Sequence, residues 1–329
     1  MKSGTACGSA LLLVLLCSAC GSSPTSPTMP GPTPTPPVPA TITITGHVSA
    51  TQTNAPLGGL SVALGTTTTT TDGSGTFSAS MLPAANVSLM LTGSGIVPRT
   101  IRVAATNTRD VTADAIALGS GFDLNFYRQF IRDGLDTPAA NYPLRRWTKQ
   151  PQILLKTVDE AGTAINGPTL ASTEQALRES LPLWTGGQFQ AAITRGTDSR
   201  AGQSGWLTIL WSTERPAGKC GNSGVGQDGG TITLYPYGNC QCGSNVVVMY
   251  PRLVKHELGH AMGFFHTDAQ SDVMYGGQLT FAPTGVCDAQ PSVRERYHAA
   301  IAYQRPVGNS DPDQDPLGVV NLAPLRAIQ

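Results

Sequence analysis

The segment from His256 to His266 constrains this chain more than any other part of its sequence. It reads HELGHAMGFFH, and the spacing of His256 and His260 places both imidazoles on one face of a helix. Glu257 lies about 100° around that helix from His256, so its carboxylate can face a bound water without competing for a metal. Gly263 can adopt the left-handed conformation that ends a helix and reverses the chain, which returns His266 as a third ligand.

Three neutral imidazoles and one open position are typical of catalytic zinc, because structural sites fill all four positions with protein ligands. A bound zinc ion lowers the pKa of its water to about 7. Glu257 is then the natural general base, taking the proton of the water and passing it to the leaving amine of a peptide bond. A lone helical histidine is usually a core residue, but three histidines and a glutamate are costly to bury without a shared ligand. We therefore expect His256, His260 and His266 to bind zinc.

The same residues resemble the metzincin metallopeptidases, whose signature HExxHxxGxxH is met at every fixed position from His256 to His266. Metzincins have a methionine turn after the third ligand, and Met274 follows His266 at a spacing similar to that of the matrixins. The resemblance implies that Met274 forms a hydrophobic floor under the zinc and that Tyr275 begins the wall of the substrate pocket. On its own, Met274 could equally be ordinary core packing.

Other features of the matrixin resemblance are partial. Thr267 stands where matrixins usually have serine, and no cysteine lies between Cys20 and Cys220 to serve as the inhibitory cysteine of a pro-segment. Matrixins also hold structural calcium, and the resemblance implies that residues 228–230, with Asp228, could supply part of a Ca2+ site. It also implies that the strand at residues 231–235 is the sheet edge that pairs with extended substrate.

The N-terminus predicts export. Residues 1–19 read as a signal peptide with an apolar stretch and small residues at its end, too short for a permanent membrane span. Cleavage before Cys20 would expose a cysteine for lipidation, with plain secretion as the alternative. Residues 20–40 contain eight prolines and read as an extended linker. We expect a cell-surface or periplasmic lipoprotein, otherwise a secreted protein.

The cysteines that remain after export also favour an oxidising compartment. These are Cys220, Cys240, Cys242 and Cys287, an even number that predicts two disulfides with three possible connectivities. The alternative is a structural metal site built on Cys240 and Cys242, although the remaining spacings fit no common zinc module.

Residues 41–118 predict a small all-β sandwich. Apolar residues alternate at the period-2 spacing of half-buried strands, as at Ile42, Ile44, Val62, Leu64, Val87, Leu89, Leu91, Ile101 and Val103. The sequence DGSG at residues 72–75 predicts a tight turn. Together with residues 46–48, this pattern resembles the carboxypeptidase regulatory-like, transthyretin-type domains. We expect a spacer or adhesion module in which His47 is structural.

Residues 119–305 predict an α/β domain, a mixed sheet with helices packed on it, as the metzincin resemblance also implies. Strands are expected at residues 153–158, 189–194, 206–211, 231–235 and 246–250, and helices at residues 173–184, behind a Ser172 cap, and 292–303, with Val293 inward. The tail, residues 306–329, is rich in proline, aspartate and glycine. It predicts a poorly ordered segment in which Asp311, Asp313 and Asp315 are solvated.

The balance of charged residues limits the classes of molecule that the chain is expected to bind. The 21 basic and 21 acidic residues balance, so no basic patch predicts nucleic-acid binding, and we expect a monomer that acts on protein or peptide substrates. The favoured function is a zinc metalloendopeptidase. The alternatives are a surface adhesion or binding lipoprotein that retains a zinc site without peptidase activity, and a zinc hydrolase of non-peptide amides.

Overall fold

We analysed a computed structural model of the chain, which describes residues 40–320 except 107, 120, 215–218, 238–250 and 278–286, and also residues 322, 323 and 325. The predicted signal peptide, Cys20 with most of the linker, Cys240, Cys242 and the strand expected at 246–250 lie outside the described residues. Residues from Ala40 onward cluster as one compact unit. Within the described residues, no helix combines the length and apolarity that a membrane span requires.

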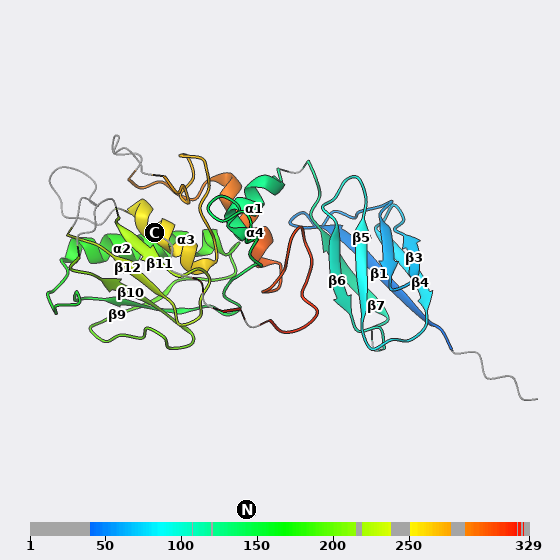
Figure 1. Cartoon of the computed structure of the whole chain (residues 1–329), viewed down its shortest axis with the longest axis horizontal. Helices are drawn as coiled ribbons and strands as arrows, with labels where there is room; N and C mark the ends of the chain where they lie inside the picture. The colour runs from blue at the N-terminus through cyan, green and yellow to red at the C-terminus, as the bar shows by residue number, and fades with distance from the viewer. Residues whose placement is uncertain are drawn as a thin grey trace, which may run out of the picture. The chain divides into compact units, whose positions relative to one another are not determined.

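The N-terminal part is β-rich, as predicted (Figure 1). One sheet has the order β4-β1-β7 and the other the order β3-β2-β5-β6. Their buried faces share a core that includes Ile44, Val62, Leu89 and Val111. The strands are β1 (Ile42–Ala50), β2 (Ser61–Leu64), β3 (Thr67–Thr70), β4 (Thr76–Met81), β5 (Val87–Thr92), β6 (Arg99–Val103) and β7 (Asp110–Ala115).

The predicted DGSG turn connects β3 to β4, but these strands belong to different sheets. Asp72 Oδ1 accepts hydrogen bonds from the backbone amides of Ser74 and Thr76, both at 2.9 Å, and Gly75 has a φ of 80°. The turn therefore passes the chain from one sheet to the other, where a hairpin would have kept both strands in one sheet.

The C-terminal part is an α/β structure with a five-stranded sheet in the order β11-β12-β10-β8-β9. The four strands β12, β10, β8 and β9 are parallel, and β11 is antiparallel to β12. The sheet is mixed, as the sequence predicted. Its strands are β8 (Gln152–Lys156), β9 (Ala192–Gly196), β10 (Trp206–Trp211), β11 (Gly221–Ser223) and β12 (Thr231–Leu234).

The edge of this sheet differs from the prediction. Residues 231–234 form β12, which lies inside the sheet because β11 pairs along its outer side, with Gly221 opposite Leu234 and Ser223 opposite Ile232. No strand was predicted at β11, because it is short and its residues do not alternate between apolar and polar. Among the strands that the structure describes, the edge strand is therefore β11, and α3 (Pro251–Met262) contacts both β11 and β12.

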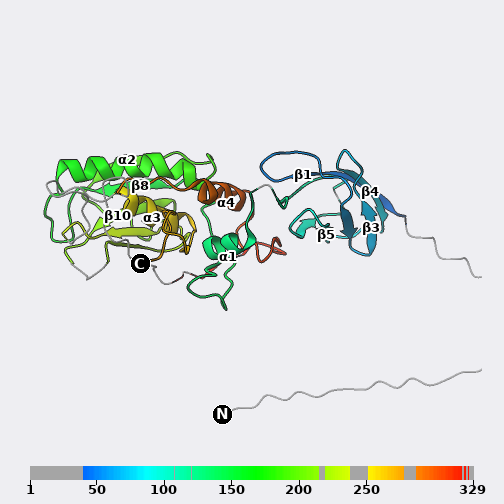
Figure 2. The same cartoon turned by 90° about the horizontal axis from the view of Figure 1, so that it is seen from above.

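Among the described residues, four helices complete this part: α1 (Leu124–Arg132), α2 (Gly167–Trp184), α3 and α4 (Val293–Tyr303). The predicted Ser172 cap is wrong, because α2 begins earlier: Asn166 accepts a hydrogen bond from the Thr169 amide at 2.8 Å and a proline occupies the first turn. α2 and α3 lie side by side (Figure 2), joined where the Trp184 indole donates to the Lys255 carbonyl at 2.9 Å.

Helix α4 has the predicted boundaries but a different inward face. Ser292 caps it, and Glu295 completes a capping box by accepting from the Ser292 amide at 2.6 Å. Val293, expected to point inward, is 74% exposed, because Glu295 occupies the buried side of the first turn. His298 is buried, donates from Nδ1 to the Arg294 carbonyl at 2.7 Å and accepts at Nε2 from the Asp123 amide at 2.9 Å, so it has a structural role.

The tail prediction is wrong for residues 306–315. Asp313 is buried and forms an ion pair with Arg305 at 2.8 Å, while Asp311 and Asp315 form ion pairs with Arg128 and Arg99. Composition could not show this, because Arg99 and Arg128 lie far from these carboxylates in the sequence and the nearby contact with Arg305 depends on the fold.

The same residues link the two parts of the chain. Arg305 also donates to Asp114 of β7 at 2.6 Å, and Thr100 of β6 exchanges backbone hydrogen bonds with Asp313 and Asp315. Val97 and Ile116 belong to the core of the α/β part although they lie in the β-rich segment. The β-rich part is thus integrated by buried polar and apolar contacts.

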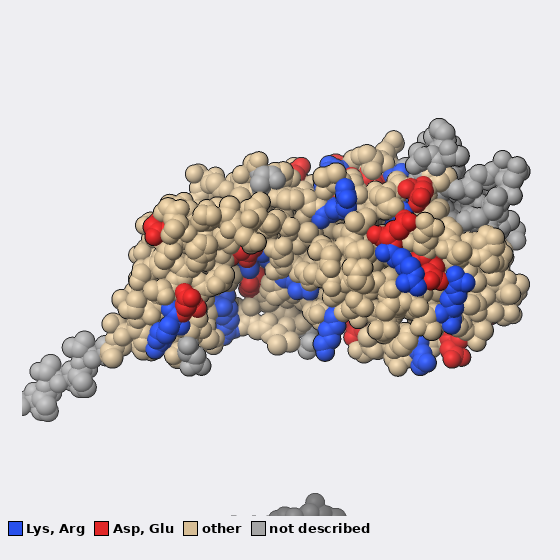
Figure 3. Space-filling view, turned by 180° about the vertical axis from the view of Figure 1, so that it is seen from behind, with Lys and Arg blue, Asp and Glu red and all other residues tan. Residues whose placement is uncertain are grey.

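Charged side chains on the surface are mixed in sign. On the face in Figure 3, lysine and arginine are interspersed with aspartate and glutamate on a mostly uncharged surface. This distribution agrees with the balanced net charge of the sequence.

Candidate metal centre

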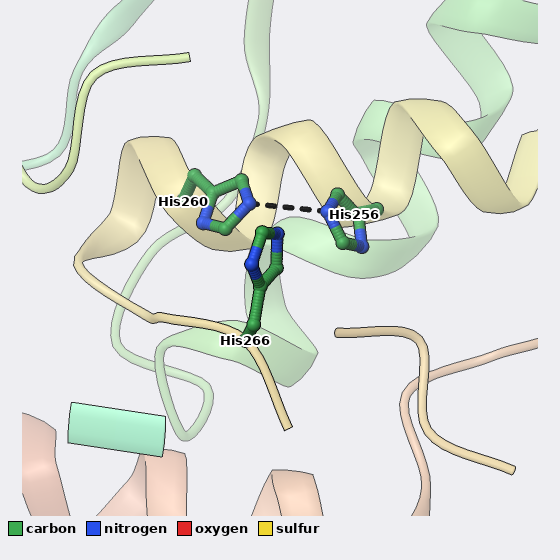
Figure 4. Close-up of side chains that lie close together, drawn as sticks. All are labelled: His256, His260 and His266. Carbon is green, nitrogen blue, oxygen red and sulfur yellow. Dashed lines mark hydrogen bonds between the residues drawn. The ribbon is translucent and has the colours of Figure 1, made fainter. Parts of the chain in front are cut away.

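The three predicted ligands come together. His256 and His260 project from α3, and His266 reaches them from the segment that follows the helix (Figure 4). Their candidate ligand atoms all lie within 4.8 Å of one another, and their ring centroids are 4.7 to 5.3 Å apart. These distances are suited to three ligands converging on one ion.

The turn at Gly263 returns His266 to the helix, as predicted. Gly263 donates its amide to the His260 carbonyl at 2.8 Å and Phe264 donates to the Gly259 carbonyl at 3.0 Å, which is the Schellman pattern that ends a helix. Gly263 has a φ of 114°, and a Cβ at this position would collide with the carbonyl oxygen of Arg145. Both the backbone conformation and the close approach therefore require glycine.

Each histidine has an acceptor at Nδ1. His256 faces the Val273 carbonyl, His260 the Phe264 carbonyl and His266 the Asp136 carboxylate, all at 2.7 Å. A carbonyl or ionised carboxylate oxygen can only accept, so each Nδ1 carries the proton and each Nε2 presents a lone pair.

The lone pairs of His256 and His260 face each other at an Nε2–Nε2 distance of 3.1 Å. Burial lowers the pKa of His256 to about 3 and holds the pKa of His260 well below its usual range, so both rings are neutral at pH 7. Two neutral acceptors at this distance repel unless they share a cation. The donor set, three imidazole nitrogens in a compact cluster, fits zinc.

Glu257 lies on the same helix and is 1% exposed. Its Oε2 has no hydrogen-bond partner in the part of the chain that the structure describes, and burial raises its pKa well above the usual value. A Cβ on Gly221 of β11 would lie 2.8 Å from Glu257 Oε1. The carboxylate therefore sits between the metal ligands and the edge strand, with one oxygen left for a group that the chain does not supply.

Met274 packs against α3 at Gly259. It is fully buried, and a Cβ on Gly259 would collide with its Sδ and would lie 3.2 Å from the ring of Trp184. Gly259 is thus the small residue that lets the methionine approach the turn between His256 and His260.

Glu295 holds the turn that carries Met274, a role that the sequence did not reveal. Its carboxylate accepts from the amides of Val273 at 3.1 Å and Met274 at 2.8 Å, besides the Ser292 amide. The Val273 carbonyl in turn accepts from His256. Glu295 therefore acts on the first metal ligand through one peptide unit.

Thr267 also holds the turn that carries Met274, through contacts with Asp272 and with the Met274 backbone. Its hydroxyl donates to buried Asp272 at 2.9 Å and its amide donates to the Met274 carbonyl at 2.8 Å. Only a hydroxyl is needed for the first contact.

The buried carboxyl of Glu295 makes stability depend on pH. Burial, and then the charge of Asp272, raise its pKa from 4.5 to about 7. Because the folded state holds this proton more tightly than the unfolded chain, we expect its contribution to be present below pH 4.5 and to be lost as the pH rises through about 7. The loss is at most ~3 kcal/mol, at about 1.4 kcal/mol per pKa unit.

The measurement is urea unfolding of the wild type and Glu295→Gln at pH 5 and pH 8. Between pH 5 and pH 8, we expect the unfolding free energy of the wild type to fall relative to that of Glu295→Gln. Glu174→Gln is the control, since the pKa of this partly exposed carboxyl is lowered, first by Arg178, and it titrates below the window. A constant difference between wild type and Glu295→Gln would contradict the expectation.

The remaining predicted site residues are distributed as follows. Cys220 and Cys287 are disulfide-bonded, while Cys240 and Cys242 lie outside the described residues. Asp228 accepts from Ser204 and from the Gly205 amide, and the histidine cluster is the only group of three or more candidate metal ligands within the described ranges. Asp228 therefore belongs to no cluster of three such side chains among the described residues. Tyr275 follows Met274 and is half-buried.

A buried helix with two histidines and a glutamate, a third histidine after a glycine turn and a methionine beneath them define a zinc metallopeptidase centre. Residues 149–285 match the family model described as "Dual-action HEIGH metallo-peptidase". That range contains the three ligands, Glu257 and Met274 but ends before Glu295 and begins after Asp136.

The crystal structure of metalloproteinase-II from Bacteroides fragilis is similar over 78% of this chain and 84% of that chain, at 14% sequence identity and a TM-score of 0.33. No curated protein matches the chain.

Proposed function

We propose that this protein is an extracytoplasmic zinc endopeptidase in which His256, His260 and His266 hold the metal and Glu257 is the general base. The observation that carries the proposal is the pair of neutral Nε2 atoms 3.1 Å apart, with the third histidine beside them. The family match supports a zinc-dependent peptidase acting on protein or peptide substrates.

In this mechanism zinc, when bound, would polarise the scissile carbonyl and acidify the attacking water. Glu257 accepts the proton of that water through the oxygen that has no partner within the described chain. Its raised pKa lets it keep the proton until the leaving amine forms, when it donates the proton to nitrogen. The tautomers fixed at Nδ1 keep the three Nε2 atoms directed at the metal throughout.

We further propose that extended polypeptide binds along β11, the edge strand beside Glu257. An unpaired strand edge offers backbone donors and acceptors to a substrate strand, and specificity then comes from pockets for alternate side chains. Because a Cβ on Gly221 would lie within 3 Å of Glu257, substrate on this edge would pass close to the general base. Tyr275 would begin the wall of one such pocket.

We propose that the protein is exported and then lipidated at Cys20, with plain secretion as the alternative. The disulfides at Cys220 and Cys287 support an oxidising compartment. A lipid anchor is tested by Cys20→Ser: a variant that stays in the membrane fraction would exclude it.

The function is tested on the purified full-length chain by metal analysis and cleavage of a mixed peptide library. We expect stoichiometric zinc, cleavage within peptides rather than only at their ends, loss of cleavage on chelation and its return with added zinc. Folded protein without zinc would overturn the metal site, and zinc-loaded protein that cleaves nothing would favour the binding lipoprotein. Cleavage restricted to small amides would favour the non-peptide hydrolase.

A further inference from the structure

Asp136 is the one charged acceptor among the three that face the histidines. Its Oδ2 lies 2.7 Å from His266 Nδ1, whereas His256 and His260 face backbone carbonyls. The Asp136 side chain is 46% exposed and lies in the loop that follows α1, far from His266 in the sequence. No motif in the sequence indicated this residue.

The contact between Asp136 and His266 is built into the packing. The Phe265 amide, next to His266, donates to the Phe130 carbonyl of α1 at 2.8 Å. The rings of Phe130 and Phe264 are stacked with their centroids 4.4 Å apart and an interplanar angle of 6°. The backbone before His266 is therefore fixed against the helix that precedes Asp136.

The loop that carries Asp136 is also closed on itself. Asp133 ends α1 in the left-handed conformation and its carbonyl accepts from the Thr137 amide at 3.0 Å. Beyond the loop, the Tyr142 amide donates to the Arg132 carbonyl at 3.1 Å, and the Tyr142 ring stacks on Phe265. Asp136 thus projects from a short anchored loop.

We propose that Asp136 is a positioning residue for the third metal ligand, fixing the tautomer and ring orientation of His266 and adding negative charge beside the metal. The inference rests on the proposed zinc site and extends the functional unit to residues before 149, where the family match begins. An ionised acceptor bonds more strongly than a carbonyl and makes the opposite ring nitrogen a better electron donor. The site therefore depends on α1 and its loop.

The test compares zinc affinity in Asp136→Asn and Asp268→Asn with the wild type, by competition with a chromophoric chelator. We expect Asp136→Asn to bind zinc about 10–100-fold more weakly, since an amide can donate as well as accept and no longer fixes the tautomer. Asp268 is the matched control: it lies two residues after His266 and is similarly exposed, but its carboxylate accepts from Gln129. Asp268→Asn should bind zinc like the wild type.

Two further measurements separate positioning from folding. The absorption spectrum of the cobalt-substituted protein should change in Asp136→Asn and be restored towards wild type in Asp136→Glu, while thermal unfolding of the metal-free proteins stays similar. Wild-type zinc affinity and an unchanged cobalt spectrum in Asp136→Asn would overturn the inference and leave the proposed function intact. A wild-type protein that binds no zinc would instead overturn the proposed function.

Discussion

Replacing Glu257 with glutamine is expected to lower peptide hydrolysis by about 10²–10⁴-fold, the usual contribution of a general acid or base. Glutamine preserves the length and volume of the side chain, which matters because a Cβ on Gly221 would already lie within 3 Å of it. The amide cannot take up the proton of the attacking water. The effect should fall on kcat, measured on a peptide taken from the library cleavage.

Zinc content decides how a loss of activity in Glu257→Gln is interpreted. Because Glu257 is not one of the three converging ligands, the variant should retain stoichiometric zinc. Glu160→Gln is a suitable control, since this carboxylate accepts from Ser212 and Thr213 and does not belong to the group of converging ligands. Wild-type turnover in Glu257→Gln would remove it from the mechanism, and loss of zinc would assign it a role in binding the metal.

The metal centre was predictable because its parts are close in the sequence. Helical periodicity brings His256 and His260 to one face, and Gly263 supplies the positive φ that brings back His266. These relations depend on local geometry alone. The alternation of apolar residues in the β-rich part is equally local, and it also gave the correct class of structure.

Features that depend on distant residues were missed or wrong. Asp136 and Glu295 act on the metal ligands from helices and loops outside the motif. β11 was missed because a strand of three small or polar residues has no periodicity, and its absence moved the predicted sheet edge to β12. The role of Asp136, the role of Glu295 and the formation of β11 all depend on contacts between residues that are distant in the sequence.

The ion pairs of residues 306–315 in the tail could not be predicted from the sequence either. Asp313 looks like one of several solvated aspartates in a Pro- and Gly-rich segment, yet it accepts from both Arg305 and Arg99. Four arginines (99, 128, 132 and 305) and four aspartates (114, 311, 313 and 315) make up this network, so its charges balance. Arg132 extends it to α1 by donating to the Asn309 carbonyl at 2.8 Å.

Arg305 is the centre of this network. It is fully buried, its Nε contacts both carboxylate oxygens of Asp313, at 2.8 and 3.0 Å, and it donates to Asp114 at 2.6 Å and Thr51 at 3.0 Å. Burial alone would lower the pKa of Arg305. The neighbouring carboxylates of Asp313 and Asp114 raise this pKa by more than burial lowers it, so the guanidinium stays charged. The pKa of Asp114 is lowered, because Arg305 and Thr51 outweigh the effect of its burial.

Arg305→Met is therefore expected to destabilise the protein by about 3–5 kcal/mol, the usual cost of leaving a buried charge without its partner. Methionine retains much of the apolar stem, so the loss reports on the charge and its hydrogen bonds. The measurement is the free energy of unfolding in urea, with Arg178→Met as the control. Arg178 is half-exposed and pairs with Glu174 on the same helix, so its replacement should cost less than about 1 kcal/mol.

The two variants also test whether the β-rich part stabilises the peptidase part or is only a spacer. If Arg305→Met and Arg178→Met lower the unfolding free energy equally, the buried network adds nothing and the spacer interpretation stands. If Arg305→Met costs several kcal/mol, the link from Asp114 through Arg305, Asp313 and Asn309 to Arg132 supports the fold across both parts. Because α1 precedes the loop of Asp136, zinc affinity should then fall with stability in Arg305→Met and stay unchanged in Arg178→Met.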